Sequence, residues 1–288
     1  MIIEMLNFWY FFWIVLFVGV FFGLYFLLKN KSDRTKKAVL SSMLWFGLLL
    51  HFLKCFIPPY STDQSRLYRD IWFINICAGN IFFFPFIFLS KSKTAKDYMF
   101  YIGVLSGMLS MLLPLEPIEK ADQAAEMLDI VRFYIHHAFL WIVPLLMVLL
   151  KLHTLSWKRV WAVPLYLLGL FLFIMLNQIF QSELGFVPLR GNDLFEIGYK
   201  NTSYIWGPDG VIGKILAKFC PDIFKTVPVG PNAGKKKYWP FFWLIVPVVV
   251  LLLPICFAIS LIFDWQNFKE DVLSAKRKIK EKIEEKRG

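Results

Sequence analysis

The chain has 288 residues, of which 58% are hydrophobic, 18% aromatic and 18% charged. A soluble globular domain carries roughly 45–50% apolar and about 25% charged residues. One soluble core of the observed composition would leave large apolar patches on its surface, which soluble monomers avoid. The formal net charge is +11, but the basic residues lie between apolar runs and do not follow one soluble segment. The composition therefore excludes a soluble domain and indicates a lipid-embedded protein without a nucleic-acid partner.

Seven apolar runs are long enough to cross a bilayer, since one crossing takes about 20 helical residues. Strand-type alternation is absent from them, and only helices or closed barrels satisfy the backbone in lipid. The sequence therefore predicts an all-α polytopic membrane protein with seven transmembrane helices. The seven runs are 8–28, 38–57, 71–89, 98–115, 130–150, 160–179 and 239–263.

The distribution of Lys and Arg predicts the orientation. If the N-terminus lies outside, the inner segments hold nineteen Lys and Arg residues and the two short outer connections hold three. The long connection 180–238 holds eight, but long loops cross membranes largely regardless of charge. We therefore expect an N-out, C-in protein. The first run is expected to remain in the protein, because Glu4 stands where a secretory signal has basic residues.

Two parts are expected in the chain. The transmembrane domain, 1–263, includes the extracytoplasmic connection 180–238, which is rich in Pro and Gly and also apolar enough to pack on the outer membrane face or between helices. The cytoplasmic tail, 264–288, is predicted as a basic amphipathic helix that either binds anionic inner-leaflet lipid or remains solvated. The apolar positions of the tail at helical spacing are Phe268, Val272, Ala275, Ile279 and Ile283.

Polar residues within the apolar runs are informative, because each costs free energy in lipid unless it is paired or hydrated. The predicted orientation places the polar residues of four helices within about 15 Å of the outer boundary, at 1.5 Å per residue. The inner halves of these helices are almost purely apolar. This agreement in depth predicts a hydrated pocket open to the outer leaflet, lined by His51, Lys54, Cys55, Asn75, Cys77, Asn80, Arg132, His136, His137, Asn177 and Gln178.

Each of these residues also has a purely structural interpretation. A cysteine packs as a small hydrophobe, His, Asn and Gln bond between helices, and Lys and Arg reach up to the headgroups. No metal site and no cofactor is expected, because His136 and His137 are adjacent and point about 100° apart on a helix. The sequence also permits a disulfide between Cys55 and Cys220 but does not require it.

A cysteine beside histidines suits acyl transfer, because the imidazole takes the thiol proton and a neighbouring cation stabilises the thiolate. In this interpretation Cys77 is the nucleophile, His136 or His137 is the base, and Asn75 or Asn80 donates to the oxyanion. The residues expected to bind substrate, an ester or amide carried by an outer-leaflet lipid, are Lys54, His51, Arg132, Asn177 and Gln178.

Two other functions stay open: a transporter or channel for a small polar solute, and a non-catalytic membrane assembly protein. A transporter should continue its polar path into the inner halves of the helices, where the sequence has no equivalent polar set. The lipid site is therefore favoured.

The third run, Ile71-Trp-Phe-Ile-Asn-Ile-Cys-Ala-Gly-Asn80, resembles the Leu-Pro-Leu-His-Leu-Cys segment of YwaF-type bacterial integral membrane proteins, with Asn75 in place of the histidine. That family is related to the eukaryotic transmembrane protein 164 acyltransferases. The fifth run, Arg132-Phe-Tyr-Ile-His-His137, is similar to its His-bearing helix, and Asn201-Thr-Ser-Tyr204 more weakly resembles its Asn-Tyr motif.

The resemblance implies a multi-pass protein of the bacterial plasma membrane in which Cys77 takes an acyl chain from a phospholipid and His136 or His137 acts as base. It also implies transfer without acyl-CoA. Membrane phospholipids are then the acyl donor and acceptor, and a lipoprotein amine is an alternative acceptor.

Overall fold

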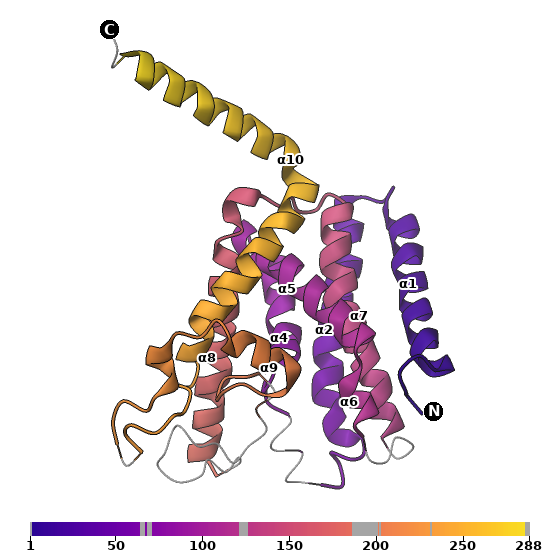
Figure 1. Cartoon of the computed structure of the whole chain (residues 1–288). Coiled ribbons are helices and arrows are strands. Elements are labelled where there is room, and N and C mark those ends of the chain that lie inside the picture. The colour runs from indigo at the N-terminus through magenta and orange to yellow at the C-terminus, as the bar shows by residue number, and fades with distance from the viewer. Residues whose placement is uncertain are drawn as a thin grey trace.

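The computed structural model describes residues 2–63, 67, 71–120, 126–185, 201, 203–230 and 232–285. The helices stand side by side in one bundle, with the N-terminus at one end and the C-terminal tail beyond the other (Figure 1). Over these residues the only β pairing is an isolated bridge between Thr226 and Lys236. The predicted all-α class is therefore confirmed.

Six helices in the described part of the chain are long and apolar enough to cross a membrane. A seventh apolar helix, α4, is shorter and corresponds to the third predicted run. The six long helices are α1 (Phe8–Leu28), α2 (Asp33–Leu53) with its extension η1 (Lys54–Phe56), α5 (Lys93–Leu112), α7 (Met127–Leu149), α8 (Ala162–Glu183) and α10 (Ile245–Glu285), which follows η4 (Phe242–Leu244). The shorter helix α4 spans Ile76–Leu89.

Helix α4 begins five residues later than the run 71–89 predicts. The side chain of Asn75 accepts a hydrogen bond from the backbone N–H of Ala78 at 2.7 Å and so caps the helix. The 14 residues of α4 cover about 21 Å at 1.5 Å per residue, less than the hydrocarbon thickness of about 30 Å. The start of α4 therefore lies within the bundle.

The irregular segment before α4 is covered by protein. Phe73 and Ile74 are buried. The carbonyl oxygen of Ile71 lies 3.0 Å from His51 Nε2, and that of Ile74 accepts from Ser203 Oγ at 3.1 Å. Irregular backbone is tolerated at membrane depth only where protein satisfies its polar groups, as it does here.

The core of the bundle is the contact between α5 and α7. A Cβ added at Gly107 of α5 would lie 2.7 Å from the carbonyl oxygen of His137 on α7, so only glycine permits this approach. Tyr101, Tyr134 and Leu140 are completely buried around it.

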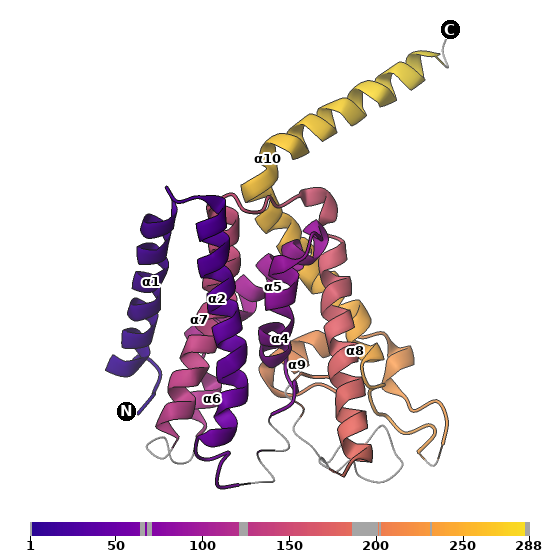
Figure 2. The ribbon, with the colours of Figure 1, turned by 180° about the vertical axis from the view of Figure 1, so that it is seen from behind.

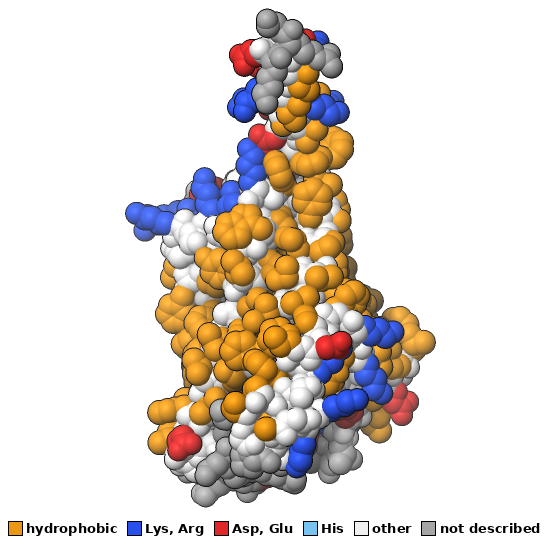
Figure 3. Space-filling view, turned by 60° about the vertical axis from the view of Figure 1, so that its left-hand side comes forward, with side chains coloured by type: hydrophobic (Ala, Val, Ile, Leu, Met, Phe, Trp, Pro, Cys, Tyr) orange, Lys and Arg blue, Asp and Glu red, His pale blue; other side chains and the backbone are white. Residues whose placement is uncertain are grey.

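Helix α1 stands at the edge of the bundle in both ribbon views (Figures 1 and 2). Trp13 stacks on Tyr134 with ring centroids 4.9 Å apart, while most of the other side chains of α1 face outward. Hydrophobic side chains also cover the flank of the bundle between its two ends (Figure 3). This belt and the helices beneath it define an integral multi-pass membrane protein.

The structure describes residues 184–185, 201, 203–230 and 232–238 of the predicted connection 180–238 outside α8. Helix α8 continues to Glu183, and the described part of the connection contains α9 (Gly210–Ala217) and η3 (Asp222–Lys225). These elements lie at the end of the bundle opposite the tail (Figure 1). All four cysteines are free, so the structure contains no disulfide between Cys55 and Cys220.

The predicted tail continues α10. The helix is kinked at Asp264, whose φ of −130° and ψ of 22° are non-helical, and it then runs on to Glu285 (Figure 1). The kink falls at the first residue of the predicted tail.

Two short elements complete the fold. α6 (Leu115–Ile118) follows α5, and η2 (Trp157–Arg159) precedes α8 at the tail end of the bundle.

Candidate functional site

A buried carboxylate organises the polar residues at the end of the bundle opposite the tail. Asp129, in the first turn of α7, is 1% exposed and accepts hydrogen bonds from Arg132 Nε at 2.7 Å and from Tyr60 Oη at 3.2 Å. Lys120 also pairs with Asp129 and with Glu126. Two cations and two acids thus balance one another, and Arg132 is held in a defined direction.

Arg132 connects this ion-pair network to a pair of stacked histidines. Its Nη1 lies 3.2 Å from His136 Nδ1, one helical turn along α7. The ring of His136 stacks on His51 of α2 with centroids 6.2 Å apart, and His51 also stacks on Phe73. Three predicted site residues from two helices are thus brought together.

Lys54 belongs to the same cluster. It lies in η1 just after α2, and only 4% of its surface is exposed. Its Nζ lies 5.4 Å from the centre of the Tyr60 ring, with the Arg132 guanidinium 6.0 Å from that centre. An aromatic face favours cations at these distances. The polar cluster is therefore His51, Lys54, Tyr60, Asp129, Arg132 and His136.

Cys77 lies in the first turn of α4, four residues after Phe73, which stacks on His51. Its Sγ is 4.0 Å from Ser110 Oγ of α5, and among the described residues no hydrogen bond joins it to a histidine. Glu116 of α6 interacts electrostatically with both Cys77 and Arg132. The N–H groups at the start of α4 give Cys77 the positive end of the helix dipole, which favours a developing negative charge.

The adjacent histidines differ in their hydrogen bonds. His137 Nδ1 lies 2.8 Å from the carbonyl oxygen of Phe133, which only accepts, so Nδ1 carries the proton and Nε2 keeps a lone pair. The guanidinium of Arg132 only donates, so His136 Nδ1 accepts and the proton of the neutral ring is on Nε2. His137 is therefore suited to be a base and His136 to be a donor.

Helix α5 contacts both His137 and Cys77, at positions one helical turn apart. Gly107 packs against the backbone of His137, and α5 and α7 run in opposite directions through the bundle. Ser110, the hydroxyl partner of Cys77, follows Gly107 by three residues and shares its helix face.

Asn80 and His136 each present a buried donor without a partner. Asn80 Oδ1 accepts from Tyr98 Oη at 2.6 Å, whereas Asn80 Nδ2 has no hydrogen-bond partner among the described residues. The same is true of His136 Nε2. Buried donors are nearly always paired, so these two indicate a place for water or for a ligand.

Asn177 and Gln178 lie near the end of α8, before the connection to α10. Gln178 Oε1 accepts from Trp206 Nε1 at 2.7 Å and so fastens the connection after α8 to that helix. Asn201 holds the same turn by bonding to Gly207 O at 2.7 Å and to the N–H of Trp206 at 3.2 Å. The bonds of Gln178 and Asn201 thus hold the turn that follows Ser203. The Ser203 hydroxyl in turn donates to the carbonyl oxygen of Ile74, just before α4.

Several residues of the site were not predicted from the sequence. They are Tyr60, Ser110, Glu116, Lys120, Asp129 and Ser203. Only Asp129 carried a local signal, because it precedes Arg132 by three residues and therefore shares its helix face.

A second buried polar group, also unpredicted, lies at the tail end of the bundle. Asp97 of α5 is fully buried, and its carboxylate pairs with His153 Nε2 and Arg159 Nε, both at 2.6 Å. The half of the bundle at the tail end is thus less uniformly apolar than the sequence indicates. Both carboxylate oxygens of Asp97 are used in ion pairs, which is typical of a structural group.

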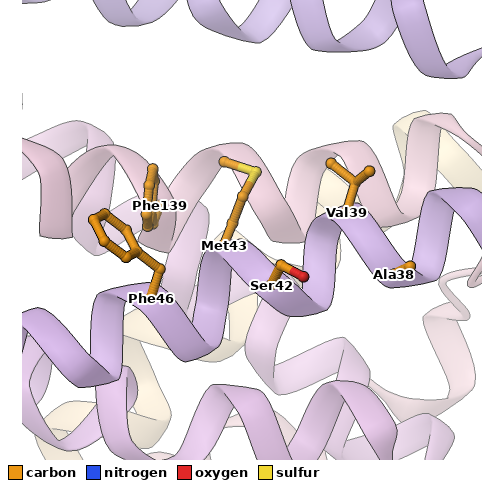
Figure 4. Close-up of a pocket in the computed structure, with 6 residues that line it drawn as sticks. All are labelled: Ala38, Val39, Ser42, Met43, Phe46 and Phe139. Atoms are coloured by element: carbon orange, nitrogen blue, oxygen red, sulfur yellow. The ribbon is translucent and has the colours of Figure 1, made fainter.

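One groove lies away from the polar cluster. It has a volume of about 420 Å³ and follows the face of α2 beside α7 (Figure 4). Its lining residues are Ala38, Val39, Ser42, Met43, Phe46 and Phe139. The lining is apolar except for the hydroxyl of Ser42, and none of its residues is charged.

The fold and the polar cluster together define a helical membrane protein with a polar centre near one end of its bundle. The family model of the TMEM164 family matches residues 4–259, and the chain belongs to that family. This confirms the resemblance carried by the segments around Cys77 and His137. No curated protein and no solved structure matches the chain.

Proposed function

We propose that the protein is a lipid acyltransferase of the bacterial plasma membrane that transfers an acyl chain from a phospholipid without acyl-CoA. One observation carries the proposal. Helix α4 begins inside the bundle with Cys77 in its first turn, three residues before Asn80 and its buried donor. Helix α5 contacts Cys77 through Ser110 and, one turn away, packs on the backbone of His137.

In the first half of the proposed reaction, Cys77 Sγ attacks the carbonyl carbon of the phospholipid ester, and the thiol proton passes to His137 Nε2. Asn80 Nδ2 and His136 Nε2–H donate to the oxyanion of the tetrahedral intermediate. The C–O bond then breaks, the leaving alkoxide takes the proton back from His137, and a lysophospholipid departs. Cys77 is left as an acyl thioester.

In the second half, a hydroxyl of a second lipid or an amine of a lipoprotein gives its proton to His137 and attacks the thioester carbon. The C–S bond breaks, and the Cys77 thiolate regains its proton. No oxidant, metal or cofactor is needed to balance either half.

The polar cluster supports this proposal as a headgroup site. Lys54 and Arg132 are cations of the kind that bind phosphate, and His51 lies between Lys54 and His136. If the N-terminus lies outside, these residues face the outer leaflet. We do not assign substrate binding to Gln178, because its side chain holds Trp206, whereas the predicted role of Asn177 stays a prediction.

The alternative of a polar-solute transporter has less support. Its path would have to connect the polar cluster with Asp97 at the other end of the bundle. Between the polar cluster and Asp97, α5 and α7 pack backbone to backbone at Gly107, which leaves no room for a solute between these two helices.

The experiment is to purify the protein with native lipid and measure its intact mass before and after hydroxylamine treatment. We expect a hydroxylamine-labile acyl adduct on Cys77 that disappears in Cys77→Ala. In Cys77→Ser the adduct should become a stable ester. Cys220→Ala is the matched control and should keep the adduct, because Cys220 lies in the connection between α8 and α10, where its thiol bonds to the carbonyl oxygen of Pro221 at 3.4 Å.

Two results together would overturn the covalent mechanism. They are the absence of any acyl adduct in the wild-type protein and undiminished acyl transfer by Cys77→Ala. Transfer lost in Cys77→Ala but kept in Cys220→Ala would support it.

A further inference from the structure

The end of α10 forms a separate feature after the kink at Asp264, which we call the tail helix (residues 265–285). It leaves the bundle at an angle and carries both hydrophobic and basic side chains (Figures 1 and 3). The acyl-transfer proposal assigns no role to this helix.

The kink bends α10 toward one particular face. Phe257 and Phe268 are eleven residues apart, three helical turns, so they share a face and would be about 16 Å apart along a straight helix. Their ring centroids are 5.8 Å apart in the structure. The face of the tail helix that carries Phe268 therefore lies on the inside of the bend, toward the membrane-spanning half of α10.

Contacts with η2 hold this bend. Asp264 Oδ2 accepts from the backbone N–H of Trp157 at 2.9 Å. Asp271 accepts from Trp157 Nε1 at 3.2 Å and from Lys158 Nζ at 2.7 Å. The Trp157 ring meets Phe268 edge-on at 5.3 Å. Anchors on both sides of Phe268 thus fix the rotation of the tail helix about its axis.

The apolar stripe of the tail helix continues the face of Phe268. Its later members include Ile279 and Ile283, which are 59% and 48% exposed. At 100° per residue, Lys276 borders this stripe on one side and Lys278 and Lys282 on the other, while Arg277 lies opposite. Five of the seven residues 276–282 are basic.

We propose that the tail helix lies on the surface of an anionic membrane, with its apolar stripe in the interface and the bordering lysines on lipid phosphates. The bend points the stripe toward the membrane that holds the bundle. Lysines on both borders suit anionic lipid and would repel a second copy of the same helix packed stripe to stripe.

The test uses the full-length protein in nanodiscs of phosphatidylcholine, with and without one third phosphatidylglycerol. Hydrogen–deuterium exchange of the amides in residues 272–285 is measured in both. We expect exchange about tenfold slower in the anionic discs, because lysines at the stripe gain contact with phosphates. Equal exchange rates in the two lipids would overturn the proposal.

Variants separate lipid binding from other causes of protection. Ile279→Ser combined with Ile283→Ser should abolish the slowing, and Lys278→Gln should reduce it. Arg277→Gln removes the same charge from the far face and should leave it unchanged. Two results would contradict a lipid contact and indicate association between helices. One is slowing of hydrogen–deuterium exchange that depends on protein concentration, and the other is slowing that persists in the variant with both Ile279→Ser and Ile283→Ser. Acyl transfer is not measured here, so failure of either proposal leaves the other standing.

Discussion

His136 and His137 are neighbours in the chain, yet their surroundings give them different chemistry. His136 Nδ1 faces a guanidinium that can only donate, and His137 Nδ1 faces a carbonyl that can only accept. The lone pair suited to take a thiol proton is therefore on His137 Nε2, while His136 Nε2–H is suited to donate.

This difference predicts unequal effects of two matched substitutions. His137→Gln removes the base, so the rate at which Cys77 acquires an acyl chain should fall by a factor of about 10² to 10⁴. His136→Gln keeps a side-chain N–H donor and should slow the reaction less. The measurement is single-turnover acylation followed by intact mass, with detergent melting curves to confirm that both variants fold. Equal rates for wild type and His137→Gln would exclude His137 as the base.

Part of the site could be predicted from single residues, and part could not. Cys77, Arg132 and His136 stand out because polar groups are costly in an apolar helix. Tyr60 and Lys120 lie in connections, where polar residues are ordinary, and the sequence does not show that both reach Asp129.

The position of Cys77 depends on where α4 begins. Asn75 ends the irregular segment by capping Ala78, and Cys77 is then the second residue of the helix. A hydropathy pattern does not show this boundary, because Phe73 and Ile74 are as apolar as the helix that follows. The bounds of α1, by contrast, agree with the predicted run 8–28, because Asn7 caps its start and polar residues follow its end.

Removing the cap should therefore affect both α4 and acylation of Cys77. Asn75→Ala loses the bond to the Ala78 N–H, which contributes about 1 kcal/mol at a helix start. We expect faster hydrogen–deuterium exchange at residues 76–79 and slower acylation of Cys77. Ser90→Ala is the control, since it removes a bond to Ile87 O at the opposite end of α4. If Asn75→Ala and Ser90→Ala behave alike, the start of α4 has no special role in acylation.

Polar groups lie at both ends of the whole molecule, and the distribution of Lys and Arg predicts which side of the membrane each end faces. The N-terminus and the polar cluster lie at one end of the bundle, and the tail lies at the other (Figure 1). The connection between α1 and α2 is at the tail end, and together with the first turns of α2 it contains five basic residues. The positive-inside rule then predicts that the tail is in the cytoplasm and the polar cluster on the outer side.

Reporter fusions in a bacterial host measure this orientation directly. Alkaline phosphatase folds only outside the cytoplasm, so it should be active when fused after Asp63 and inactive when fused to the C-terminus. A fluorescent protein at the C-terminus should be bright, because it matures in the cytoplasm. Replacing Lys29, Lys31, Arg34, Lys36 and Lys37 with Gln should weaken this pattern, since orientation rests on such charges. The reverse pattern in the unmodified chain would place the polar cluster at the inner leaflet, and the proposed lipid substrate would then be one of the cytoplasmic side.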